Sequence, residues 1–164
     1  MEWELKTFPG KEDKKTLSLL FQGLSGILPV VAKSGYSHWD VQHDPDDKYS
    51  PINGVYYTKM TTSLYESLNF KIDGYQPSGF YACHSEALLI TWFVEKYFPY
   101  LVEEYSTGSR EELSQPPRHV LILSNRKPCE VCEKFAEHVK NRTEVDIVVE
   151  YREPNSPKGT RRPM

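Results

Sequence analysis

Two short segments of the chain combine residue types that bind metal ions. The first places His84 two residues before Glu86, and the second is a C-x-x-C pair formed by Cys129 and Cys132. A C-x-x-C pair serves either redox exchange or metal binding. The redox type usually lies near the first strand–helix unit, whereas this pair lies in the last quarter of the chain. Two thiolates are too few for a structural zinc site, so a third ligand has to come from elsewhere.

His84 is the candidate for that third ligand. One imidazole and two thiolates leave one position of a tetrahedral zinc site open for water, as in catalytic sites. We expect all three ligands at helix starts, where the partial positive charge of the helix favours thiolate. Glu86 is offset by about 200° around a helix from His84. We therefore expect Glu86 to exchange protons with the bound water and not to bind the ion itself.

The combined pattern H-x-E…P-C-x-x-C, formed by His84, Glu86, Pro128, Cys129 and Cys132, resembles the cytidine deaminase-like superfamily. The resemblance implies a zinc ion bound by His84, Cys129 and Cys132, and Glu86 as the general acid and base. It also implies a three-layer α/β/α fold with a mixed sheet. Members deaminate free nucleosides, nucleotides, guanine or bases in nucleic acid, and some are bacterial toxins.

The expected reaction is hydrolytic deamination of cytosine to uracil, with zinc-activated hydroxide as nucleophile and Glu86 as proton shuttle. Residues 118–142 hold six basic and three acidic residues around the cysteine pair. This local charge suits phosphate contacts, so we expect single-stranded DNA or another nucleic acid as substrate. Two alternatives stay open: deamination of free cytidine, deoxycytidine or a nucleotide, and a catalytically inactive zinc-binding module. The presence of Glu86 argues against the inactive module.

Five further residues are candidates for substrate binding. Phe80 and Tyr81 come just before the first motif and suit the walls of a base pocket, since nucleobases stack on aromatic side chains. Asn53 is a candidate contact for the sugar or the base. Ser85, which stands where alanine is common in the family, and Pro128 complete the set.

The composition fits one soluble globular domain. The chain has 164 residues, of which 38% are hydrophobic and 26% charged, and its formal net charge is −3. These values exclude disorder throughout and a strongly basic nucleic-acid binder. No apolar run approaches the roughly 20 residues of a membrane helix, and the polar start carries no secretory signal. We therefore expect a cytoplasmic protein, or a delivered toxin-like domain, without a membrane partner.

The chain has three cysteines, and this odd number argues against a disulfide scaffold and a disulfide-linked partner. Cys83, next to the first motif, is expected to be a buried thiol.

Hydrophobic patterns and turn residues predict the elements that would position these groups. We expect a buried helix over 16–31, a hairpin turn at 53–54, a strand over 55–60, a helix over 83–98, a strand over 119–124, a helix from 129 and a strand over 145–151. Residues 33–54, with a short strand over 36–41, and the segments 73–79 and 103–117 are expected to be irregular. Alternation over 79–151 predicts a parallel pair of strands. One deaminase domain would span 1–151, followed by a flexible tail over 152–164.

Overall fold

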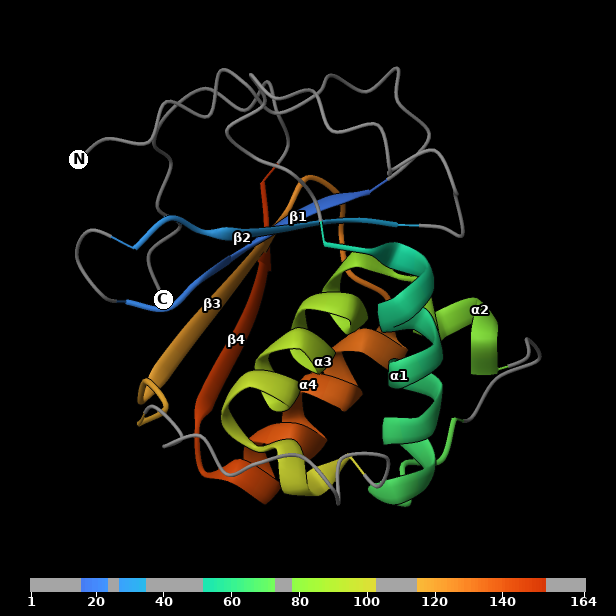
Figure 1. Ribbon diagram of the computed structural model, residues 1–164. Helices are drawn as coiled ribbons and strands as arrows, with labels where there is room; N and C mark the ends of the chain where they lie inside the picture. The colour runs from blue at the N-terminus through green and yellow to red at the C-terminus, as the bar shows by residue number, and fades with distance from the viewer. Residues whose placement is uncertain (1–15, 24–26, 35–51, 73–77, 103–114, 153–164) are drawn as a thin grey trace.

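A four-stranded sheet with helices packed on it forms the part of the protein that the structure describes (Figure 1). The computed structural model describes residues 16–23, 27–34, 52–72, 78–102 and 115–152. In chain order its elements are β1 (Leu17–Phe21), β2 (Val30–Lys33), α1 (Gly54–Ser67), α2 (Ser78–Ala82), α3 (Ser85–Tyr97), the short 3₁₀ helix η3 (Pro99–Leu101), β3 (His119–Ser124), α4 (Glu130–Thr143) and β4 (Asp146–Tyr151).

The sheet has the strand order β2-β1-β3-β4. β1 is antiparallel to both of its neighbours, whereas β3 and β4 are parallel. α4 connects the two parallel strands, because parallel neighbours need a crossover connection. The expected α/β class with a mixed sheet is confirmed, and so is the parallel pair of strands.

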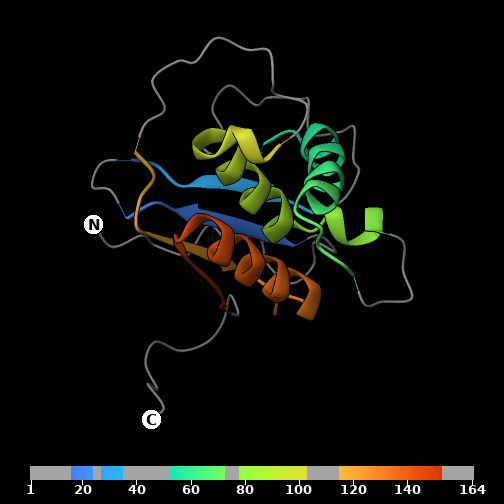
Figure 2. The same ribbon diagram turned by 90° about the horizontal axis from the view of Figure 1, so that it is seen from below.

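The helices α1, α3 and α4 lie on the same face of the sheet in both views (Figures 1 and 2). Leu20 of β1 and Ile122 of β3 belong to the hydrophobic core beneath these helices. The neighbouring Leu19 and Leu123 alternate to the other face and are buried there as well. The described residues therefore form two layers, and the second helical layer of the expected three-layer fold is not among them.

The second half of the chain follows the sequence-based expectations. α3, β3, α4 and β4 form at the predicted positions. In α4 the buried side chains Cys132, Phe135, Ala136 and Val139 recur at three-to-four spacing and form one apolar face. None of the described helices is long and apolar enough to cross a membrane.

The expected helix over 16–31 is wrong, because β1 and β2 occupy this segment. The consecutive apolar residues of Leu17–Phe21 satisfy a helical period, but they suit a central strand equally well. β1 pairs on both edges and is buried on both faces, which is where such continuous runs occur. Gly23, with φ +67°, lies two residues after the end of the strand and takes a backbone conformation that other residues rarely adopt.

The expected strand over 55–60 and the hairpin turn at 53–54 are also wrong, because α1 begins there. The side-chain oxygen of Asn53 caps the helix by accepting a hydrogen bond from the Tyr56 backbone N–H at 3.0 Å. Thr58, one of the β-branched residues that suggested a strand, fits the helix because its hydroxyl donates to the Gly54 carbonyl of the preceding turn at 2.6 Å.

The remaining sequence-based expectations concern two loops, a short strand and the C-terminal tail. Of the expected loop over 73–79, residues 78–79 begin the short helix α2. The expected strand over 36–41, the tail from 153 onward and most of the loop over 103–117 lie outside the described residues.

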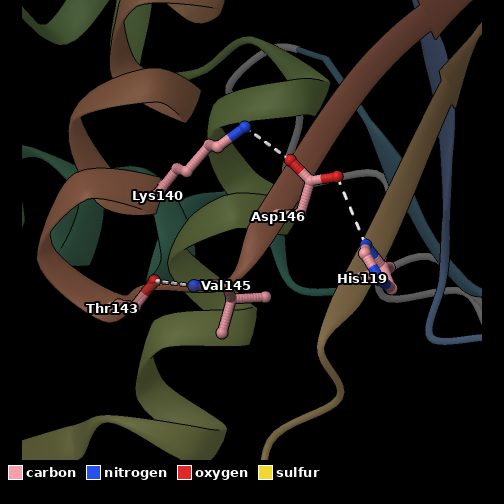
Figure 3. Close-up of polar contacts among 5 residues, drawn as sticks. All are labelled: His119, Lys140, Thr143, Val145 and Asp146. Carbon is pink, nitrogen blue, oxygen red and sulfur yellow. Dashed lines mark hydrogen bonds and ion pairs between the residues drawn. The ribbon is translucent and has the colours of Figure 1, made fainter.

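Polar contacts at one end of the sheet join α4 to β3 and β4 (Figure 3). Asp146 accepts from Lys140 Nζ at 2.5 Å and lies 3.3 Å from His119 Nδ1. These two contacts lower the pKa of the Asp146 carboxyl group, that with Lys140 more strongly. Thr143 Oγ1 accepts from the Val145 backbone N–H at 3.3 Å, which helps to end the helix.

Leu20→Ala and Ile27→Ala together test the corrected assignment of residues 16–31. Leu20 is fully buried in β1, so its truncation is expected to lower the free energy of unfolding by about 2–5 kcal/mol. Ile27 is 51% exposed, and its truncation is expected to change this free energy by less than about 0.5 kcal/mol. Denaturant unfolding measures both values. A large loss for Ile27→Ala would favour the buried helix instead.

Candidate metal centre

The starts of two helices bring the three predicted ligands together. His84 is the N-cap residue of α3, and Cys129 is the N-cap residue of α4, with Cys132 in the first turn of that helix. The ligand atoms of the three residues all lie within 4.8 Å of one another. His84 Nδ1 is 3.3 Å from Cys129 Sγ and 3.5 Å from Cys132 Sγ. This group can hold a metal ion.

Backbone amides of both helix starts point at the two sulfur atoms. The Cys132 N–H donates to Cys129 Sγ at 3.4 Å, and the Ala87 N–H of α3 donates to the Cys132 sulfur. Free N–H groups of a first helical turn favour negative charge. The backbone is therefore already arranged to stabilise thiolates at both positions.

The two cysteines differ in their ionisation. The pKa of Cys129 is lowered to about 4, first by a hydrogen bond from the Cys132 thiol and then by one from His84. The same hydrogen bond and burial raise the pKa of Cys132 well above its usual value. The hydrogen bond with Cys129 also raises the pKa of His84. Metal binding needs deprotonated ligands, so the lowered pKa of Cys129 favours binding and the raised pKa of Cys132 opposes it.

Glu86 is buried beside this cluster. The carboxylate lies in the first turn of α3 and is only 3% exposed. Its Oε1 accepts a hydrogen bond from Ser124 Oγ at 2.7 Å, and Oε2 lies 3.4 Å from Ser85 Oγ. A buried carboxylate next to metal ligands is an expensive arrangement, and such groups concentrate at functional sites.

Two aromatic rings of α2 flank the imidazole. The ring centre of His84 lies 5.5 Å from that of Phe80 and 5.9 Å from that of Tyr81. The two aromatic rings meet edge to face at 5.3 Å. Phe80 is 50% exposed, so an apolar ring borders the ligands and is open to solvent. The structure therefore brings both predicted pocket residues to the metal centre.

The other predicted substrate residues are placed differently. Ser85 is fully buried and is hydrogen-bonded to Ser18 of the sheet, and Pro128 is also buried. Asn53 is exposed at the start of α1, and its described hydrogen bond is the helix cap. Cys83, expected to be buried, is partly exposed, and its thiol donates to the Phe80 carbonyl at 3.1 Å.

Three residues near the site carry no motif in the sequence. Ser18 and Ser124 are paired directly across β1 and β3 and are fully buried. Tyr65 of α1 is buried, and its hydroxyl has no hydrogen-bond partner within the described part of the chain. In the sequence, each of the two serines stands out only as a polar residue within an otherwise apolar strand. For Tyr65 the sequence carries no comparable signal.

Compared with known proteins, the chain matches no protein family, no curated protein and no solved structure. The geometry of the metal centre and its neighbours therefore carries the functional argument.

The metal centre can be tested by substitution of the cysteines. We expect one tightly bound metal ion per chain, measured by elemental analysis of protein purified without chelator. Cys129→Ser and Cys132→Ser should each lose the ion and lower the melting temperature, because metal binding contributes to folding. Cys83→Ser is the matched control and should keep both. Loss of metal in the control alone would contradict the assigned ligand set.

Proposed function

We propose that the protein is a zinc-dependent hydrolytic deaminase that converts cytosine to uracil, with single-stranded DNA as its favoured substrate. The observation that carries the proposal is the position of the buried Glu86 carboxylate beside a cluster of one imidazole and two thiols. The cytosine base and the reaction come from the resemblance of the H-x-E…P-C-x-x-C pattern to the cytidine deaminase-like superfamily.

The spacing of the three ligand atoms fits zinc. With Zn–S bonds near 2.3 Å and Zn–N bonds near 2.0 Å, a tetrahedral site separates sulfur from nitrogen by about 3.5 Å. His84 Nδ1 lies 3.3 and 3.5 Å from the two sulfur atoms. Three protein ligands leave a fourth position for water or substrate. When bound, zinc would make a water molecule acidic enough to attack near neutral pH.

Glu86 moves the protons of the proposed reaction. Its carboxylate takes a proton from the attacking water as the new C–O bond forms at C4 of cytosine. It delivers this proton to the ring nitrogen. It then takes the proton of the new hydroxyl group on C4 and passes it to the amino group, which leaves as ammonia when the C–N bond breaks. Burial keeps bulk water away from these transfers, and the Ser124 hydroxyl holds the carboxylate in place.

Groups around the cluster suit a base that enters from a nucleic-acid strand. The exposed face of Phe80 provides a stacking surface beside His84. Arg126 and Lys127 are exposed on the loop between β3 and Cys129. Their positive charge suits phosphates on either side of the reacting base, and this favours single-stranded DNA over free cytidine.

The buried carboxylate also argues against a zinc-binding module without catalytic activity. A structural metal site gains nothing from Glu86, whose burial costs free energy unless all its hydrogen bonds are made. Replacing it with an apolar residue would remove that cost.

Glu86→Gln tests the catalytic role. The wild-type protein should form uracil in an oligonucleotide with a single cytosine, measured by mass spectrometry. The Glu86→Gln variant should lose at least about 100-fold in rate, because general acid–base catalysis is removed. Its metal content should be unchanged. A wild-type protein that deaminates neither the oligonucleotide nor free cytidine would overturn the proposal.

Lys127→Ala separates the two substrate classes. We expect a higher KM for the oligonucleotide and a salt dependence of log KM that is weaker by about one unit of slope. Activity on free cytidine should stay the same. Lys140→Ala, which removes a charge in the last turn of α4, is the control and should leave both substrates unaffected. Equal activity of the wild type on free cytidine and on the oligonucleotide, without any Lys127 effect, would favour the free nucleoside.

A further inference from the structure

Four buried polar side chains meet where β1, β3 and α3 come together. Ser18 and Ser124 face each other across the two strands, and Ser85 and Glu86 begin the helix above them. The three serines are fully buried. Ser18 Oγ is 2.7 Å from Ser85 Oγ and is also hydrogen-bonded to Ser124 Oγ, and Ser124 Oγ lies 2.7 Å from Glu86 Oε1.

These serines lie in a part of the core where apolar residues would be expected. The next residues on the same face of the two strands are Leu20 and Ile122, which are both fully buried. A buried hydroxyl costs free energy unless it is hydrogen-bonded, and an alanine at the same place carries no such cost. A polar cluster at this position therefore needs a polar partner, and Glu86 is the charged group that it contacts.

The number of hydroxyl protons decides which residue donates and which accepts in each of these hydrogen bonds. Each serine hydroxyl has a single proton to donate. Ser124 donates its proton to Glu86 Oε1, so in its contact with Ser18 it can only accept. Ser18 then donates to Ser124 and has to accept from Ser85.

The same count leaves the second carboxylate oxygen only weakly held. The Ser85 proton is used mainly towards Ser18 at 2.7 Å, and its hydrogen bond to Glu86 Oε2 is long, at 3.4 Å. Among the described residues, no other hydrogen bond to Oε2 is present. One oxygen of Glu86 is thus anchored to the sheet by a short hydrogen bond, and the other is held by a long one.

We propose that Ser85, Ser18 and Ser124 form a one-directional chain of hydrogen bonds that orients Glu86, with Oε1 anchored and Oε2 kept as the proton-exchanging oxygen. The part that concerns the reaction rests on the proposed deaminase function. The serines are positioning residues, because they act through Glu86 and touch no reacting atom. Hydrogen bonds in series polarise one another, so each hydroxyl strengthens the bond that ends on the carboxylate.

The proposal predicts an effect that decreases with distance from Glu86. Ser124→Ala leaves Oε1 buried without a donor and frees the carboxylate to rotate, so kcat should fall about 10- to 100-fold, since small misplacements are costly in catalysis. KM should stay within about twofold because substrate contacts are intact. Ser18→Ala, which does not touch Glu86, should lower kcat only a few-fold. Ser124→Thr keeps a hydroxyl and should restore most of the activity.

A buried hydroxyl pair elsewhere on the same helix supplies the control. Thr91 of α3 and Thr61 of α1 are fully buried with their Oγ1 atoms 2.6 Å apart. Thr91→Val removes this hydrogen bond at equal size and should lower the melting temperature without changing kcat. If Ser124→Ala changes kcat no more than Thr91→Val does, the serines only support the fold, and the proposal is overturned.

A double-mutant cycle tests the chain without any use of activity. Unfolding of the metal-loaded protein would be compared for the wild type, Ser124→Ala, Glu86→Gln and the double variant. A hydrogen bond to a charged acceptor is roughly twice as strong as one to a neutral acceptor. Ser124→Ala should therefore raise the unfolding equilibrium constant at least about fivefold more in the wild type than in the Glu86→Gln background. If Ser124→Ala changes the unfolding equilibrium constant equally in both backgrounds, the proposed hydrogen-bond chain is overturned.

The two experiments keep the proposals apart. A protein that deaminates no substrate but shows the expected coupling would refute the deaminase function while supporting the serine chain. An active protein without coupling between Ser124 and Glu86 would refute the proposed hydrogen-bond chain and leave the deaminase function standing.

Discussion

A carboxylate that is 3% exposed has to find its hydrogen bonds inside the protein, and this requirement links the sheet to the metal centre. Glu86 finds its donor, Ser124, at the end of β3. The first turn of α3 must therefore pack against the ends of β1 and β3. His84, two residues earlier, is then held where α4 begins, beside Cys129. One buried carboxyl group thus connects strand pairing, helix packing and the placement of a candidate metal ligand.

The metal centre also depends on where two helices begin. A helix start presents backbone N–H groups that no carbonyl of the helix can accept, and these groups stabilise negative charge. His84 and Cys129 are the N-cap residues of their helices, so the ligands lie where the backbone favours thiolate. α4 connects the two parallel strands, which fixes its position against the sheet. The site is consequently built from rigid elements rather than from loops.

The second half of the fold and the cysteine pair could be predicted because their patterns are local. Cys129 and Cys132 share one helical turn, and α4 shows its buried face at helical spacing. The first half could not be predicted in this way. The run Leu17–Phe21 becomes a strand through pairing with β3, more than a hundred residues away. The role of Ser18 could not be predicted for the same reason, since it gains its partner Ser124 only once the register of that pairing is set.

Ser85 of α3 has a physical counterpart in β1, the buried Ser18. In the proposed chain Ser85 supplies the proton that Ser18 accepts, and Ser18 in turn donates to Ser124. An alanine at position 85 would leave the buried Ser18 oxygen without this donor. An apolar residue at position 18 would leave the Ser85 proton to Glu86 Oε2, which lies 3.4 Å away. The two serines therefore make sense as a pair, and a change at one position should be tolerated best together with a change at the other.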